Sequence, residues 1–161
     1  LRKELPVLES IGTTKLTFNS TLSKSKMEQN EMIILFNGET VTNSTGTGSR
    51  PLQGQSNMII NTELSFTTHH NFQIAAAFNN FSKRLVSLGS GNVADEYEYP
   101  FPSLNLTARK NFESFSVKIK LINLLDSSIR FGQIEPGGKL RLTNTYQPGR
   151  QISINVEYQY K

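Results

Sequence analysis

The 161-residue sequence contains no cysteine, no tryptophan and no long apolar run. Without cysteine, disulfides, thiol nucleophiles and cysteine-bound zinc are excluded. No stretch approaches the ~20 apolar residues of a membrane-spanning helix, which excludes a helical membrane protein. A transmembrane β-strand needs only ~9–11 alternating residues, so a membrane barrel stays open. The first residues, Leu1 to Pro6, have no apolar core of a signal peptide and no initiator methionine, so we expect a processed chain or a fragment.

Charge of neither sign is concentrated in one segment. Lys and Arg number 17 and Asp and Glu 13, which gives a net charge of +4. Because no dense basic run is present, nucleic acid is not an expected partner. The hydrophobic fraction of 36% is low for a protein with a dry core. The 10 Phe and 5 Tyr residues, beside many Thr, Ser and Asn, favour strands and turns.

Alternation of apolar and polar residues is the clearest signal, and it is strongest at residues 151–160. Ile152, Ile154, Val156, Tyr158 and Tyr160 alternate there with polar residues. A period of two predicts a strand with one apolar and one polar face. Five more segments repeat the pattern, at residues 15–22, 57–66, 72–79, 104–109 and 115–121. No segment has convincing helical periodicity.

The connections between these segments alternate in length. Short ones lie around residues 68–71 and 111–114, and long ones at about 26–55, 85–102 and 124–144. Transmembrane barrels have this arrangement, with short periplasmic turns and long extracellular loops. Within the first long loop, Ile33 to Phe36 followed by Asn37-Gly38 predicts a small hairpin, because Asn-Gly favours a type I′ turn.

Alternation alone does not say which face is wet, so a soluble β-sandwich remains an alternative to a membrane barrel. Three features favour the barrel. Bulky hydrated groups occupy the polar face, the strands exceed the usual ~5–6 residues, and aromatic residues stand at strand ends. These aromatic residues are Phe72, Tyr97, Tyr99, Phe101, Phe112, Phe115, Tyr158 and Tyr160.

Several strings, in order along nearly the whole chain, resemble the C-terminal barrel of TonB-dependent receptors of the Bacteroidetes type. Arg50-Pro51-Leu52-Gln53-Gly54-Gln55-Ser56 is similar to the family's RPLQGQS segment, and residues 78–85 resemble its next strand. Asn123-Leu124-Leu125-Asp126 is similar to a strand end in the family, and Tyr146-Gln147-Pro148-Gly149-Arg150 to the segment before its last strand. No single match is decisive, but the ordered set is specific. One departure is the ending Tyr160-Lys161, where many outer-membrane proteins end in an aromatic residue.

The resemblance implies an all-β fold, an antiparallel up-and-down transmembrane β-barrel of which residues 1–161 form the C-terminal part, without the plug domain. About six full strands are predicted against ~22 in a plugged barrel, so a fragment is expected. It also implies location in the outer membrane of a Gram-negative bacterium, with the C-terminus periplasmic. The partners implied are lipid, the rest of the barrel and its plug, the TonB system through the plug, and an imported metal chelate or oligomeric nutrient. A complete small barrel with a structural or adhesin role, needing about eight strands, is the main alternative.

Arg109, Lys118 and Lys120 are the candidate lumen-facing residues. They would pair with acids of a plug or guide an anionic solute, unless they only hydrate a polar wall. His69-His70 lacks a third metal ligand nearby, and Asp95, Glu96, Glu98 and Asp126 follow no calcium-loop spacing. Residues 44–49 lack the ending of a phosphate loop and predict a loop tip. No catalytic set, metal site or cofactor is therefore predicted.

Overall fold

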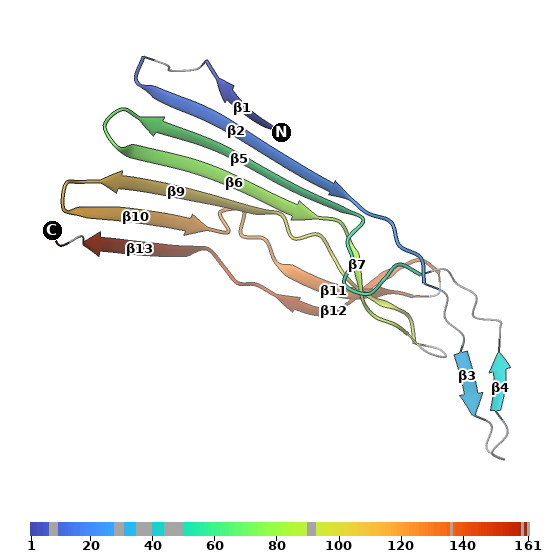
Figure 1. The fold of residues 1–161 in the computed structure, drawn as a ribbon. Coiled ribbons are helices and arrows are strands. Elements are labelled where there is room, and N and C mark those ends of the chain that lie inside the picture. Colours follow the sequence, from blue (N-terminus) through green and yellow to red (C-terminus); the bar gives the residue numbers. More distant parts are fainter. Residues whose placement is uncertain are drawn as a thin grey trace.

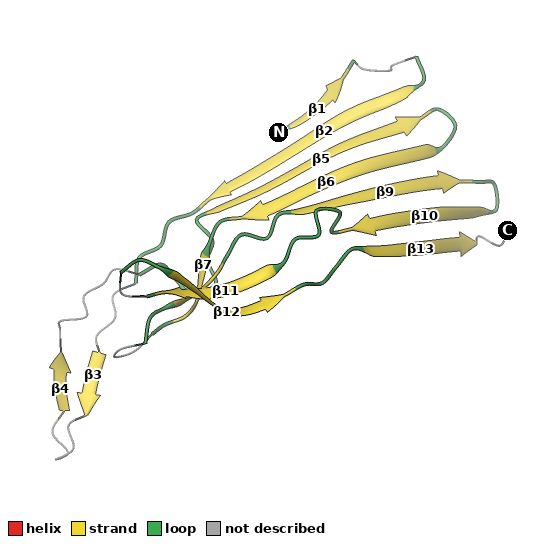
Figure 2. Cartoon of the chain, turned by 180° about the vertical axis from the view of Figure 1, so that it is seen from behind, coloured by secondary structure: helices red, strands yellow, loops and turns green. Residues whose placement is uncertain are grey.

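The computed structural model describes residues 1–6, 10–27, 31–34, 40–43, 50–89, 93–135, 137–158 and 160. Within these ranges all regular structure is strand (Figure 2). No helix long and apolar enough to cross a membrane occurs among these residues. The expectation of an all-β chain with antiparallel sheets is confirmed.

Seven strands form one large sheet in which neighbours in space follow one another along the chain (Figure 1). They are β1 (Arg2–Leu5), β2 (Gly12–Leu22), β5 (Met58–Thr68), β6 (Phe72–Phe81), β9 (Ser103–Asn111), β10 (Phe115–Ile122) and β13 (Gln151–Tyr158). All neighbouring pairs are antiparallel, so the sheet is an up-and-down meander. It is open, with β1 and β13 at its edges, and the strands do not close into a barrel. Each of the six segments predicted from alternation corresponds to one of these strands.

The connections alternate as the sequence predicts. Short turns join β5 to β6 at residues 69–71 and β9 to β10 at residues 112–114. At the opposite end, residues 23–57, 82–102 and 123–150 make the long connections (Figure 1). These two ends are called the turn end and the long-connection end.

The long connections are not simple loops, which corrects the sequence-based expectation. Two of them contribute β7 (Arg84–Ser87), β8 (Glu96–Glu98), β11 (Ile129–Ile134) and β12 (Leu140–Tyr146) to a four-stranded sheet of order β12-β11-β8-β7. This small sheet lies beyond the long-connection end of the large sheet (Figures 1 and 2). Its strands are short, so period-two alternation is weak in them. The small sheet forms because strands from different connections pair with one another, and no local sequence pattern predicts that pairing.

The predicted hairpin in the first long connection is confirmed in its pairing. β3 (Glu31–Ile34) pairs with β4 (Thr40–Asn43), with Ile34 opposite Thr40. Residues 35–39, with the Asn37-Gly38 turn, fall outside the described ranges. This hairpin forms a separate two-stranded sheet and does not join the large one. It therefore does not supply the two additional strands that a small closed barrel would need.

The large sheet is a single layer. Among the described strands, no extensive contacts join the large sheet to the small one, so the two do not stack as a sandwich. Leu85 of β7 is the only apolar side chain that is fully buried within the described residues. The fold therefore lacks the shared inner core that defines a β-sandwich.

Candidate functional site

The register divides the large sheet into two chemically different faces. Directly paired residues point to the same face, and one row reads Leu16, Leu64, Ala76, Leu106, Leu121 and Ile152 from β2 to β13. The next row toward the turn end reads Thr14, Phe66, Ile74, Ala108, Ile119 and Ile154. We call this side the apolar face. Its side chains range from half-buried to well exposed, apart from the buried Thr14, and Ile154 is 63% and Leu64 47% accessible.

Charged residues are rare on the apolar face. Among its described positions only Lys3 and Lys110 are charged. Lys110 stands beside the turn end, where its Nζ donates to the His70 carbonyl oxygen at 2.6 Å. Lys3 lies on the edge strand β1, opposite Leu16. The strands from β2 to β13 therefore present an apolar surface interrupted by charge only at its border.

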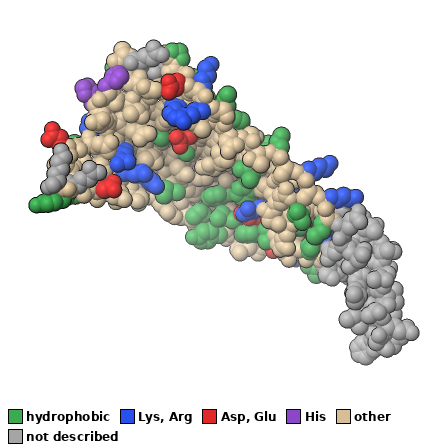
Figure 3. Space-filling view, viewed as in Figure 1, with side chains coloured by type: hydrophobic (Ala, Val, Ile, Leu, Met, Phe, Trp, Pro, Cys, Tyr) green, Lys and Arg blue, Asp and Glu red, His purple; other side chains and the backbone are tan. Residues whose placement is uncertain are grey.

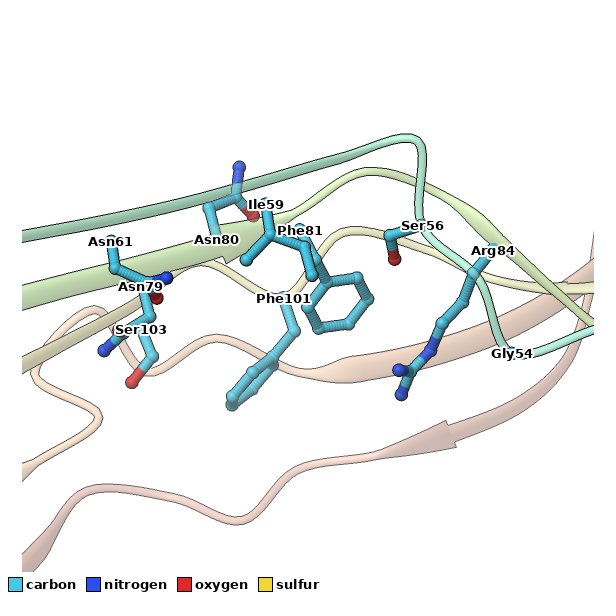
Figure 4. A pocket seen from close by; sticks show the side chains of 10 residues that line it. All are labelled: Gly54, Ser56, Ile59, Asn61, Asn79, Asn80, Phe81, Arg84, Phe101 and Ser103. Atoms are coloured by element: carbon cyan, nitrogen blue, oxygen red, sulfur yellow. The ribbon is translucent and has the colours of Figure 1, made fainter. Parts of the chain in front are cut away.

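Aromatic residues collect at the turn end of the apolar face, as the sequence predicts for part of the set. Phe72 faces Lys110, and Phe115 faces Tyr158. The rings of Phe112 and Phe115 stack with centroids 4.3 Å apart. The expectation is wrong for Tyr97, which lies inside β8 of the small sheet. Phe101 precedes β9 and turns to the opposite face of the sheet, because it shares the parity of Ser103 (Figure 4).

The other side of the sheet, the polar face, carries the three predicted basic residues. Figure 3 shows charged side chains scattered over this face of the large sheet. Lys118 is the direct cross-strand partner of Arg109, and Lys120 is that of Thr107. The Arg109 Nε donates to Asn111 Oδ1 at 2.9 Å, and its Nη2 lies 3.8 Å from Glu157 Oε2. The structure thus brings Arg109, Lys118 and Lys120 together on one face, with a single weak ion pair among exposed groups.

The predicted motif at residues 50–56 lies against the small sheet. The Gly54 amide donates to the Leu85 carbonyl oxygen at 2.7 Å, and the Gln53 side-chain amide donates to the Val86 carbonyl oxygen. The Gln55 amide closes a turn by donating to the Leu52 oxygen at 3.2 Å, just after Pro51. This segment covers Leu85, which is completely buried. These hydrogen bonds from Gln53 and Gly54 attach the motif to β7.

Ion pairs fix the same region. Arg50 Nε lies 3.0 Å from Asp95 Oδ2, and Arg84 Nη2 lies 2.7 Å from Glu98 Oε2. Asp95 also accepts from the Gly89 amide at 2.8 Å. Burial, and then the nearby Asp95 carboxylate, raise the pKa of the Tyr97 phenol above its ordinary value of 10.0.

The other two predicted motifs meet in a junction cluster, formed by Asn105, Asn123, Ser127, Gly149 and Arg150. Asn123 is 3% exposed, and its Nδ2 donates to the oxygens of Ser127 at 3.2 Å and Gly149 at 3.1 Å. Its Oδ1 accepts from the Ser127 amide at 3.0 Å, and its backbone amide donates to Asn105 Oδ1 at 3.0 Å. Arg150 Nε donates to the Leu124 oxygen at 3.1 Å. The cluster joins the start of β9 and the end of β10 to the start of β13.

Positive φ angles explain the residue types in this cluster. Asn123 and Asp126 both have φ of +54°, and Gly149, which follows Pro148, has φ of +71°. Asparagine, aspartate and glycine tolerate this left-handed region best. The positive φ angles therefore explain why Asn, Asp and Gly stand at these positions of the two motifs.

The weaker sequence candidates have ordinary surroundings. His69 and His70 sit on an exposed turn, and Glu96 accepts from the Thr143 hydroxyl. Asp95 and Glu98 are engaged by arginines, as described above. In the part of the chain that the structure describes, no three His, Asp or Glu side chains form a cluster that could hold a metal ion. Residues 44–49 lie outside the described ranges.

A hollow of ≈ 330 Å³ opens on the polar face at the long-connection end, and sequence reasoning missed it. We call it the rim hollow. Its lining combines amide and hydroxyl groups with apolar rings; the residues are Gly54, Ser56, Ile59, Asn61, Asn79, Asn80, Phe81, Arg84, Phe101 and Ser103 (Figure 4). Asn61, Asn79 and Ser103 are direct cross-strand neighbours. The only sequence signal for this hollow was a polar residue on the same face near the end of each strand. Which of these residues lie side by side depends on the register between the strands, and the sequence does not give that register.

The comparisons with known protein families, curated proteins and solved structures gave no match to this chain.

Proposed function

We propose that the large sheet is a wall of a transmembrane β-barrel in a bacterial outer membrane, and that the chain is a segment of a TonB-dependent receptor. In this proposal the apolar face contacts lipid and the polar face lines a water-filled interior. The long connections face outward and meet an imported ligand, while the short turns and the C-terminus are periplasmic. The chain acts as scaffold and ligand-facing surface.

One observation carries the proposal: an apolar face that continues over adjacent strands of a single-layer sheet, opposite a face rich in Lys, Arg, Asn and Thr. In water, such an exposed surface would be an aggregation liability, since soluble monomers rarely expose apolar patches above a few hundred Å². In lipid it is the expected outer surface of a barrel. Contact with lipid would remove this apolar surface from water, which stabilises the membrane-bound state by roughly 25 cal/mol per Å².

Strand length supports the same environment. β2 and β5 have 11 residues each, β6 has 10 and β9 has 9. Tilted strands of ~9–11 residues span the hydrocarbon layer. Because open edges are not tolerated in lipid, the proposal requires that β1 and β13 pair with further strands.

The receptor part of the proposal rests on the resemblance of the motifs at residues 50–56, 123–126 and 146–150. Each of these occurs where a long connection leaves or rejoins the large sheet or packs on the small sheet. Such positions shape the outward-facing end of a barrel, where a receptor meets its ligand.

Spin labelling tests which face contacts lipid, and these 161 residues contain no cysteine that would compete with an introduced one. Lys118→Cys and Ile119→Cys place nitroxides on opposite faces of β10. In the intact polypeptide that carries these strands, folded into lipid vesicles, we expect the label at 119 to be more accessible to dissolved oxygen. The label at 118 should be more accessible to a water-soluble nickel chelate. Equal aqueous accessibility, or burial of both labels, contradicts the barrel wall.

Intact mass tests the receptor assignment. The polypeptide that carries these strands would be isolated from outer membranes and weighed. A plugged receptor requires a mass several times the 18.1 kDa of this sequence. A native mass near 18.1 kDa would instead favour a small self-closing barrel.

A further inference from the structure

The rim hollow places hydrogen-bonding groups and apolar rings on the same side of the sheet. Asn61, Asn79 and Ser103 project side by side from β5, β6 and β9 (Figure 4). Next to them, nearer the long-connection end, lie the rings of Phe81 and Phe101 (Figure 4). Amide side chains both donate and accept hydrogen bonds. The hollow thus offers a polar row and an apolar platform to one ligand.

The hydrogen-bonding row retains free capacity. Ser103 Oγ donates to Asn105 Oδ1 at 3.3 Å, which leaves its lone pairs to accept. No hydrogen bond involving the Asn61 or Asn79 side chain is found within the described residues. A ligand hydroxyl would therefore meet amide donors and acceptors without displacing a protein bond.

The lining of the rim hollow has little net charge that could bind an ionic ligand. Arg84 is its only charged lining residue, and its guanidinium lies 2.7 Å from Glu98 Oε2. The same guanidinium lies 4.7 Å from the centroid of Phe81, so it covers that ring. Phe101, which is half-buried and also lines the hollow, has no cation over its ring among the described residues. A carboxylate-rich chelate would find no uncommitted cation among these lining residues.

We propose that the rim hollow binds a neutral saccharide unit, whose hydroxyl groups bond to Asn61, Asn79 and Ser103 while its C–H face packs on Phe101. Its volume lies at the lower end of ligand pockets, about 300–1,000 Å³, and suits one or two sugar rings. The inference rests on the proposed function, because it needs the polar face to be open to water. It selects an oligomeric nutrient over a metal chelate.

Binding is tested with the intact polypeptide that carries these strands, in zwitterionic detergent micelles, because glucoside and maltoside detergents carry competing sugars. Maltose, cellobiose and xylobiose are the neutral probes, and gallium citrate is a diamagnetic anionic chelate for comparison. Saturation-transfer NMR reports which probe contacts the protein, and titration gives its dissociation constant. We expect at least one disaccharide to bind and gallium citrate not to bind.

Variants locate the binding. Asn79→Ala and Phe101→Ala should each weaken binding by about tenfold or more, as loss of hydrogen bonds or of a packed ring predicts. Gln73→Ala, near the other end of the polar side of β6, is the control and should change it by less than about twofold. Far-UV circular dichroism checks that each variant keeps its strands.

Three outcomes overturn the inference: no disaccharide binds, gallium citrate binds instead, or Gln73→Ala weakens binding as much as Asn79→Ala. The spin labels on β10 separate this failure from failure of the proposed function. If the labels report lipid on one face and water on the other while sugars do not bind, the saccharide inference alone fails. If the labels contradict the barrel wall, the proposed function fails and the inference falls with it.

Discussion

Asn123 concentrates more hydrogen bonds than any other side chain of the junction cluster. The residue is buried and has a left-handed backbone conformation, and both its side-chain nitrogen and its side-chain oxygen form hydrogen bonds. A buried polar group stabilises only while its partners remain, and an unpaired one costs about 1–3 kcal/mol. Loss of this side chain would orphan the Ser127 amide and the Gly149 oxygen together. The residue therefore ties the segment before β13 to the end of β10, beside the backbone pairing of the two strands.

Substitution separates the two roles of Asn123. Asn123→Gly keeps the backbone at ease and removes the amide, so we expect a loss of about 1–3 kcal/mol in the free energy of unfolding. Asn123→Ala adds a left-handed backbone penalty of about 1–2 kcal/mol. Urea unfolding in lipid vesicles measures both. Asn155→Ala, on the exposed polar face of β13, is the control and should stay within about 0.5 kcal/mol. Equal stability of Asn123→Gly and the parent would refute the role.

Tyr97 makes the small sheet sensitive to alkaline pH. Burial raises the pKa of its phenol above 10.0, so the folded chain holds this proton more tightly than the unfolded chain does. The associated stability is fully present below pH 10.0 and is lost as pH rises through the higher folded value. In an absorbance titration of phenolate, Tyr97→Phe should remove a late ionisation step above pH 10.0. Persistence of that late step would show that another tyrosine causes it.

At the scale of elements, two adjacent residues of β9 show how the two faces of the sheet differ. Leu106 lies in a row with Leu64, Ala76 and Leu121, while Thr107 faces Lys120 across β10. A strand in a barrel wall needs this alternation because one side meets hydrocarbon and the other meets water. A soluble sandwich would instead bury the Leu106 side between two sheets.

Arginine at these two positions distinguishes the environments. Leu106→Arg should destabilise the vesicle-folded protein by about 2–4 kcal/mol, because a charge near the bilayer midplane is costly. Thr107→Arg, its neighbour on the polar face, should cost less than about 1 kcal/mol. Urea unfolding in vesicles gives both values. Similar costs for the two variants would argue against lipid on the apolar face.

At the scale of the whole molecule, the meander and its connections define two ends with different lengths of chain. Turns of a few residues close one end, and the other end carries the small sheet and the β3–β4 hairpin. In a barrel the longer connections face outward and the shorter turns face the periplasm. In the proposed barrel, the lengths of the connections would therefore set the orientation of the chain.

An epitope tag reads this orientation in cells. Inserted between Gly137 and Gly138, both exposed and with positive φ, the tag should be reached by antibody on intact cells. Inserted between His69 and His70, on the turn end, it should be reached only after the outer membrane is permeabilised. Antibody access to the turn-end tag on intact cells would reverse the proposed orientation.

The sequence predicted the large sheet well because its signal is local. Alternation within a strand fixes which face each residue takes, and the predicted ends at residues 22, 79 and 121 lie within two residues of the observed ends at 22, 81 and 122. The grouping of Arg109, Lys118 and Lys120 on one face followed from parity once the strands were paired. The motifs at residues 123–126 and 148–150 also reflect local backbone needs, because Asn, Asp and Gly meet the left-handed φ angles there.

The small sheet and the rim hollow were decided by tertiary structure. β8 has three residues, and its partners β7 and β11 come from separate connections, so no periodicity within one segment announces the pairing. Arg50 meets Asp95, and Asn61 meets Asn79 and Ser103, only after the strands align. The sequence by itself determined the two-faced sheet, since side-chain alternation is a property of one strand. Contacts between distant segments decided the structure of the long-connection end, because closing long loops depends on where their ends are held.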